Sequence, residues 1–305
     1  MIGSVWKKYK VYIVSFFSLS LFVAAILGLW QLQPQAPLQT VLSEKSQTSP
    51  LPPESQGFEP KDGSVTSDKT VKFKGKMLPD SLIFIISSDF QLTAKADASG
   101  AFEKEVTLSS GLNLIDIISV SGDLAKELRK STALYLADDN TASAVAAGSV
   151  KTIFDNVITV SALNSQITVR TSSLTDIVFP QDAAQKESTE SAKDIRVGDY
   201  LVALGDAKDA DTIAAKKITI IRDNKPQNNE VLSSVKILTA PKLNLFTAKT
   251  NKDAKILELT LTKTTQGLLD GKEAQVTDIQ KDKNAVIIYH EGGTKKIVDL
   301  VYLLP

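Results

Sequence analysis

The sequence has no cysteine and only one histidine among its 305 residues. Without cysteine there can be no disulfide bond, no thiolate metal site, no cysteine nucleophile and no lipidated N-terminal cysteine. A single histidine excludes metal sites built from several imidazoles and leaves few groups that could activate a nucleophile at neutral pH. The composition therefore predicts a protein that is not an enzyme and that uses no cofactor.

Excess charge and aromatic side chains are also scarce. The chain carries 35 basic and 35 acidic residues, and Phe, Trp and Tyr make up 6% of it. A nucleic-acid-binding protein normally has a basic excess, so the balance predicts no nucleic-acid partner. The low aromatic content argues against a large aromatic platform for stacking sugars.

What the sequence does contain is one long apolar run without charge, residues 11–30. As a helix, these 20 residues would span about 30 Å, the thickness of the hydrocarbon core of a bilayer. Residue types that prefer membrane interfaces flank the run: Trp6, Lys7, Lys8, Tyr9, Lys10, Tyr12 and Trp30. We predict a single transmembrane helix over residues 11–30, with residues 1–10 in the cytoplasm and the remaining chain extracytoplasmic.

The alternative is a secretory signal peptide that is cleaved. The apolar core of a signal peptide is usually about 7–15 residues long and is followed by small residues at the cleavage site. Here the run is longer, and Trp30-Gln31-Leu32-Gln33 follows it. The sequence favours an uncleaved membrane anchor, although both interpretations export the rest of the chain.

Residues 31–60 contain six of the eleven prolines, and Gln and Ser fill much of the remainder. Such a composition buries too little apolar surface to fold, and proline favours an extended backbone. This segment is predicted to be a disordered stalk.

Short alternating segments dominate residues 61–137. Val71 and Phe73 alternate with lysines, Phe102 and Val106 share one face of a period-2 pattern, and residues 114–121 are apolar on both faces. About seven strands separated by turns in such a length are typical of a small β-sandwich, in which residues 114–121 would form a central strand.

Four motifs in this region resemble those of the bacterial Ig-like domains of exported and surface proteins, over about residues 58–137. They are Pro60-Lys-Asp62-Gly63, Val71-x-Phe73-x-Gly75, Asp97-x-Ser99-Gly100-x-Phe102 and Leu108-x-x-Gly111-x-Asn113-x-Ile115. The resemblance implies an Ig-like sandwich on the outside of the cell. It implies no particular ligand, because this fold serves many functions.

The rest of the chain reads as two divergent copies of one unit, residues 141–224 and 229–305. Five segments match at a spacing of about 80–89 residues, among them Ser149-Val150 with Ser234-Val235 and Asp194-Ile195 with Asp278-Ile279. Such a spacing indicates an internal repeat. Each copy is predicted to be a small β-barrel.

The first copy resembles a small β-barrel family of unknown function from bacterial exported proteins. The shared marks are Gly148-x-Val-x-x-Ile153 and Asp194-Ile-Arg-Val-Gly198-Asp199. In the second copy Lys283-Asn284 would stand in the place of Gly198-Asp199. The family implies no activity for either copy.

Few residues are candidates for chemistry. Asp206, Asp209 and Asp211 could offer oxygen ligands to calcium, although their spacing matches no EF-hand and a solvated turn is the default interpretation. His290 precedes a glycine turn and is predicted to be a solvated hairpin residue. Glu103 and Glu105 form an acidic pair that is predicted to lie on an exposed strand face.

The sequence thus predicts a mainly β protein with an N-terminal transmembrane helix, an Ig-like β-sandwich and two small barrel-like repeats. The function expected from it is that of a non-catalytic envelope protein that presents these modules to a protein or glycan partner. Two alternatives remain open, a regulatory or assembly subunit of an envelope complex and a carbohydrate-binding accessory module.

Overall fold

The computed structural model describes residues 57–138, 141–180, 191–222, 225–227 and 229–305. The predicted membrane helix, and the predicted stalk up to residue 56, lie outside these residues. In the part of the chain that is described, no helix is long and apolar enough to cross a membrane. Residues 55–305 cluster as one compact unit, and this unit is mainly β.

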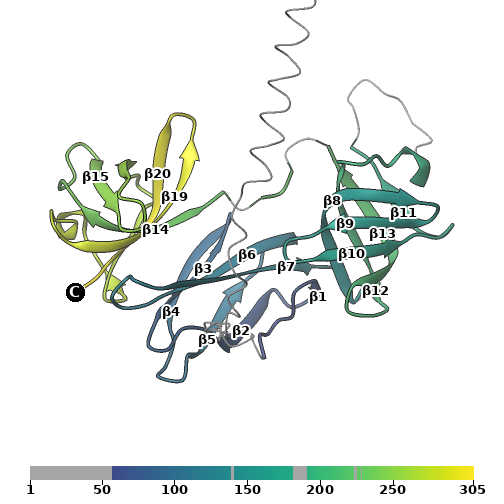
Figure 1. Cartoon of the computed structure of the whole chain (residues 1–305), viewed down its shortest axis with the longest axis horizontal. Coiled ribbons are helices and arrows are strands. Elements are labelled where there is room, and N and C mark those ends of the chain that lie inside the picture. Colours follow the sequence, from purple (N-terminus) through teal and green to yellow (C-terminus); the bar gives the residue numbers. More distant parts are fainter. Residues whose placement is uncertain (1–56, 139–140, 181–190, 223–224, 228) are drawn as a thin grey trace, which may run out of the picture. The chain divides into compact units, whose positions relative to one another are not determined.

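The N-terminal part of this unit is a two-layer arrangement of strands, here called the β block (Figure 1). Its strands are β1 (Ser64–Thr66), β2 (Thr70–Lys76), β3 (Leu82–Ser87), β4 (Phe90–Lys95), β5 (Ala101–Thr107), β6 (Gly111–Val120) and β7 (Glu127–Leu136). One sheet runs β1-β7-β6-β3-β4, and β2 pairs with β5 in a second sheet. Phe73 and Phe102 of the small sheet are buried with Ile85, Ile115 and Ile117 of the large one.

Strand β6 lies between β7 and β3, which confirms the prediction of a central strand. Its side chains alternate between two apolar cores. Ile115 and Ile117 point toward β2 and β5, whereas Ile118 and Val120 pack with Phe84 in a second cluster. Because successive strand residues face opposite sides, burial on both faces requires apolar residues at nearly every position.

The next part of the chain is a closed barrel, here called the first barrel. Its strands are β8 (Ala144–Phe154), β9 (Val157–Ser161), β10 (Gln166–Arg170), β12 (Tyr200–Ala207) and β13 (Thr212–Ile221). The ring closes in the order β8-β9-β10-β13-β12-β8, with β10 and β13 parallel. The short strand β11 (Asp176–Val178) and the 3-10 helix η1 (Ala192–Asp194) lie in the connection between β10 and β12.

The second barrel repeats this connectivity. Its strands are β14 (Val231–Ile237), β15 (Leu245–Thr250), β16 (Ile256–Thr260), β19 (Asn284–Gly292) and β20 (Lys295–Leu303), with β17 (Gln266–Leu269), β18 (Lys272–Glu273) and the 3-10 helix η2 (Val276–Asp278) in the β16–β19 connection. The ring closes in the order β14-β15-β16-β20-β19-β14, with β16 and β20 parallel. A closed five-stranded Greek-key barrel is the architecture of the OB-fold.

Local details are repeated as well as the strand order. The β12–β13 pairing shifts register opposite Leu204/Gly205, with Lys216 as the extra residue of β13, and the β19–β20 pairing shifts opposite Ile288/Tyr289, with Asp299 as the extra residue of β20. In both η1 and η2 the carboxylate of the last residue, Asp194 or Asp278, accepts a hydrogen bond from the backbone N–H of the N-cap residue. An alternating strand pattern does not by itself produce bulges or helix caps. Their recurrence at equivalent positions therefore supports the view that the two barrels are copies of one structural unit.

The register of the repeat differs from the sequence prediction in places. The backbone N–H of Gly198 donates to Val150 O, and that of Asp282 donates to Ile237 O, so these two pairs are equivalent. Val150 therefore corresponds to Ile237 rather than to Val235. Asp282, with φ of 68°, takes the turn position that Gly198 holds with φ of 94°. The strand match is thus shifted by two residues and the turn match by one. A shift by two residues keeps the inward and outward pattern of a strand, which is why sequence alternation alone did not detect it.

Both barrels pack on the β block through equivalent strands. Val145 of β8 and Val202 of β12 pack against Val65 of β1. Their counterparts Leu232 of β14 and Val286 of β19 pack in the cluster that also contains Phe84, Ile118 and Val120 of the β block. In addition, β1 pairs with both β7 and β8, so one continuous sheet joins the β block to the first barrel.

Candidate binding pocket beside the first barrel

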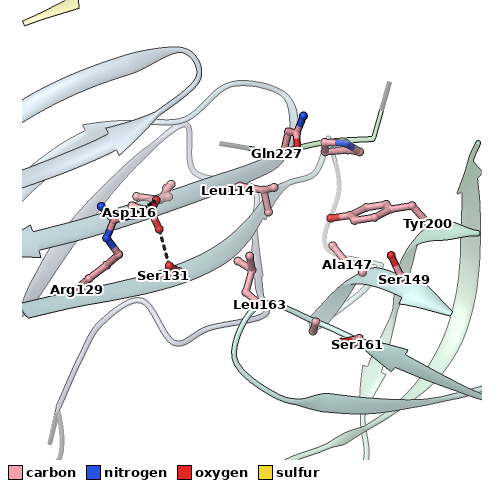
Figure 2. A pocket seen from close by; sticks show the side chains of 14 residues that line it. Leu114, Asp116, Arg129, Ser131, Ala147, Ser149, Ser161, Leu163, Tyr200 and Gln227 are labelled. Atoms are coloured by element: carbon pink, nitrogen blue, oxygen red, sulfur yellow. Dashed lines mark hydrogen bonds and ion pairs between the residues drawn. The ribbon is translucent and has the colours of Figure 1, made fainter. Parts of the chain in front are cut away.

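A cavity of about 370 Å³ lies where the β block meets the first barrel. Strands β6 and β7 form one wall, strands β8, β9 and β12 form the opposite wall, and Pro226 and Gln227 border it (Figure 2). Ligand sites are common at such junctions between modules, and this volume is near the lower end of the range for small-molecule sites.

The wall from the β block carries a hydrogen-bonded charge pair. Asp116 of β6 accepts a hydrogen bond of 2.5 Å from the hydroxyl of Ser131, and its other oxygen lies 3.6 Å from the guanidinium of Arg129 (Figure 2). Ser131 and Arg129 are on β7, directly across the ladder from β6. The carboxylate of Asp116 is thereby held in one orientation, with 16% of its side chain exposed.

The wall from the first barrel carries hydroxyl groups. Tyr200 is the first residue of β12 and faces away from the barrel core, because the next residue, Leu201, is buried inside the barrel. Its hydroxyl points into the cavity (Figure 2). Burial raises the pKa of Tyr200, so its hydroxyl stays protonated at neutral pH and can donate a hydrogen bond. Ser149 and Ser161 line the same wall.

Glycine is required at one lining position, Gly148. A Cβ atom there would lie 2.0 Å from the backbone oxygen of Ser161 in the neighbouring strand. Glycine therefore permits a close approach of β8 and β9 at this point. This gives a physical reason for the glycine that marks the first repeat in the sequence.

The loop between β9 and β10 fixes the two walls to each other. The side-chain amide of Asn164 donates 2.8 Å hydrogen bonds to Asp62 Oδ2 and to the backbone oxygen of Ser131. Asp62 in turn accepts a 2.8 Å hydrogen bond from the backbone N–H of Ala133. These contacts and the shared strand β1 give the cavity a preformed shape.

The three calcium candidates do not converge. Asp206 forms a 2.7 Å ion pair with Lys216, and Asp209 accepts a hydrogen bond from the backbone N–H of Asp211. Within the described ranges, no group of three or more His, Cys, Asp or Glu side chains is arranged to hold a metal ion. The hydrogen bond from Lys216 is the main cause that lowers the pKa of Asp206, and a positive charge at this distance disfavours a cation site.

His290 lies in the β19–β20 hairpin with a partly exposed side chain, as expected from the sequence, and it also has a side-chain partner. It lies within β19, and its Nδ1 is 2.8 Å from Asp299 Oδ2 on the adjacent strand β20. Its side chain is 36% exposed. Glu230 lies nearby with one oxygen buried and without a hydrogen bond, and burial raises its pKa. The contact that the structure shows at this position is a hydrogen bond between the His290 ring and the Asp299 carboxylate.

The remaining acidic candidates have structural contacts. Glu103 and Glu105 are exposed, and Glu103 forms a 2.9 Å ion pair with Lys72. Asp194 and Asp278, which were matched between the repeats, cap η1 and η2 by accepting hydrogen bonds from the backbone N–H groups of Ser191 and Gln275.

The sequence did not identify the residues of the cavity. Asp116 and Arg129 come from the consecutive strands β6 and β7, whereas Tyr200 comes from β12, which is distant in the chain, and each residue fits an ordinary strand pattern. The one signal that points to this place is Gly148. It could be recognised as a mark of the repeat, but not as part of a cavity.

Comparisons with known proteins add no functional assignment. No protein-family model and no curated protein matches the chain. Among solved structures, one described as "drosophila Unr CSD456" is 11% identical, with 77% of this chain and 98% of that chain covered and a TM-score of 0.21. A score this low carries no argument about fold or function.

Proposed function

We propose that the protein is a membrane-anchored, extracytoplasmic, non-catalytic binding protein of the cell envelope. The uncharged run at residues 11–30, with lysines before it, supports a single-pass anchor with the compact unit outside. The two-layer β block supports an Ig-like sandwich, and the repeated connectivity of the barrels supports tandem presentation of one module type.

The observation that carries a binding role is the cavity between the β block and the first barrel. Its walls are joined by a shared sheet and by the Asn164 contacts, so the site needs little rearrangement to accept a ligand. Its charged lining residues, Asp116 and Arg129, neutralise each other. Such a lining suits recognition rather than acid–base chemistry, which needs a group that changes protonation near neutral pH.

A second candidate is a regulatory or assembly subunit that binds another envelope protein. One observation favours it: in the second barrel Leu243 and Ile256 are exposed, Ile256 to 62%. Leu243 also has φ of 50°, which is unusual for a bulky residue. Leu243 lies in the turn before β15 and Ile256 begins β16, and exposed apolar side chains of this kind are typical of protein contact sites.

The anchor and the orientation can be tested with C-terminal fusions of the full chain. Alkaline phosphatase should be active and green fluorescent protein, exported by the general secretion route, should be dark. Active fluorescent protein together with inactive phosphatase would contradict the proposed topology.

The binding role can be tested by co-purification from solubilised membranes. The full chain should retain an envelope component, and Leu243→Ser with Ile256→Ser should release it if the partner is a protein held by the second barrel. Lys272→Ser, at an exposed position of β18, which pairs with neither β15 nor β16, serves as the matched control. Failure to retain any protein or glycan would contradict a binding function.

A further inference from the structure

The lining of the cavity beside the first barrel indicates the chemical class of its ligand, because it presents hydroxyl groups that form no hydrogen bond within the described protein. Among the described residues, none is hydrogen-bonded to the hydroxyls of Tyr200, Ser149 or Ser161. A hydroxyl can donate one hydrogen bond and accept two. These groups are therefore available to a molecule in the cavity.

The opposite wall, formed by the β block, adds charged groups that can donate hydrogen bonds to a ligand or accept them from it. Asp116 offers a carboxylate acceptor whose orientation Ser131 fixes, and Arg129 offers N–H donors on a side chain that is 42% exposed. Gln227, at the border, can both donate and accept. A ligand would thus meet donors and acceptors on both sides at once (Figure 2).

Charge limits the class of ligand. Asp116 and Arg129 are the charged residues among those that line the cavity, and they form an ion pair. Because the charges of Asp116 and Arg129 offset each other, the lining carries no net charge that would attract an anion or a cation. The lining therefore favours a neutral molecule.

Apolar groups complete the description. Leu114 and Leu163 face the cavity from the two walls (Figure 2), and Gly148 and Ala162 also line it with little or no side chain. A neutral molecule that combines many hydroxyl groups with apolar C–H edges is a sugar. The volume of about 370 Å³ is small, so it suits a terminal saccharide unit rather than a long chain.

We propose that this cavity binds a neutral saccharide unit, with the Tyr200 hydroxyl on one side and the Asp116–Arg129 pair on the other as its main contacts. The proposal rests on the proposed function of an extracytoplasmic binding protein and specifies its ligand class. It assigns no chemistry to the site beyond binding.

The test uses the full chain in a detergent without a sugar headgroup. Dissociation constants are measured by NMR titration with the methyl glycosides of glucose, galactose and N-acetylglucosamine, and with glucuronate and glucosamine as anionic and cationic counterparts. At least one neutral glycoside should bind, and the charged counterparts should bind at least about threefold more weakly. Absence of binding by every neutral probe, or equal binding of the charged ones, would overturn the proposal.

Substitutions of lining residues test whether the sugar binds in this cavity. Tyr200→Phe removes only a hydroxyl and should weaken binding about threefold to tenfold, the effect of losing one neutral hydrogen bond. Tyr135→Phe, a half-buried tyrosine of β7 outside the cavity lining, should change binding less than twofold. Ser149→Ala is a second variant and should also weaken binding. Unchanged affinity in both Tyr200→Phe and Ser149→Ala would refute the assignment of the cavity.

The outcomes separate this inference from the proposed function. If the protein retains an envelope protein during co-purification but binds no sugar, the saccharide site is wrong and the binding role stands. If the fusions report the opposite topology while a sugar binds in the Tyr200-dependent manner, the envelope location is wrong and the site stands.

Discussion

At the scale of single residues, the close approach of β8 and β9 makes Gly148 the most constrained lining position. We expect Gly148→Ala to destabilise the protein by about 1–3 kcal/mol, because the added methyl group must displace the backbone of Ser161. Urea unfolding measures the change. Gly122→Ala is the matched control, since no atom lies within 4 Å of a Cβ there, and it should leave stability nearly unchanged.

Because Glu230 is partly buried, we predict that the stability of the protein depends on pH. Burial raises its pKa, and the charges of Asp299 and Asp89 add to this effect, so the folded state binds the proton more tightly than the unfolded state. Its contribution to stability is fully present below the ordinary value of 4.5 and is lost as pH rises through the raised folded value.

Replacing Glu230 with glutamine, which has the same shape but no charge, should prevent the loss of stability that the wild type shows as pH rises. Glu230→Gln should be more stable than the wild type at pH 7 by about 0.5 kcal/mol, a small gain because solvent screens a half-exposed group. The two proteins should converge near pH 4, as measured by urea unfolding at each pH. The exposed carboxyl of Glu258 provides the control, and an equal gain in Glu258→Gln would show that the effect is not local.

At the scale of elements, Asp62 connects the start of the β block to strand β7 and to the β9–β10 loop. Its carboxylate accepts hydrogen bonds from Ala133 N and from the Asn164 amide on the β9–β10 loop. We expect Asp62→Ala to cost about 1–3 kcal/mol, because the backbone N–H of Ala133 loses its acceptor in a partly buried place. Hydrogen exchange should accelerate at Ala133 and in residues 162–165.

The exposed Asp68, in the turn that follows β1, serves as the control for Asp62. Asp68→Ala should change stability by less than about 0.5 kcal/mol, as is usual for surface positions. If both variants unfold at the same urea concentration, the Asp62 contacts do not hold the β block to the first barrel.

At the scale of the whole molecule, we expect a folded β unit attached to the membrane through a protease-sensitive segment. Limited proteolysis of intact cells should cut between Gln31 and Pro60 and release a stable fragment. Its circular dichroism should be dominated by β-structure, because strands make up most of the described residues. Resistance of this segment to protease, equal to that of the folded unit, would contradict the stalk.

The sequence by itself determined the β class, the central position of β6 and the existence of a repeat. Each of these depends on local alternation of apolar and polar residues, which the sequence displays directly. Residues 114–121 are the clearest example, because their apolar side chains fall on both faces of the strand, as burial on both faces demands.

The tertiary structure decided the rest. Closure of each barrel depends on parallel pairing of strands distant in the chain, such as β10 with β13, and the register of the repeat depends on hydrogen bonds such as that from Asp282 to Ile237. The cavity likewise exists only because β1 joins two modules and brings Asp116 opposite Tyr200. Such long-range pairings leave no periodic trace in the sequence, since each strand involved has the same alternation that any other partner would require.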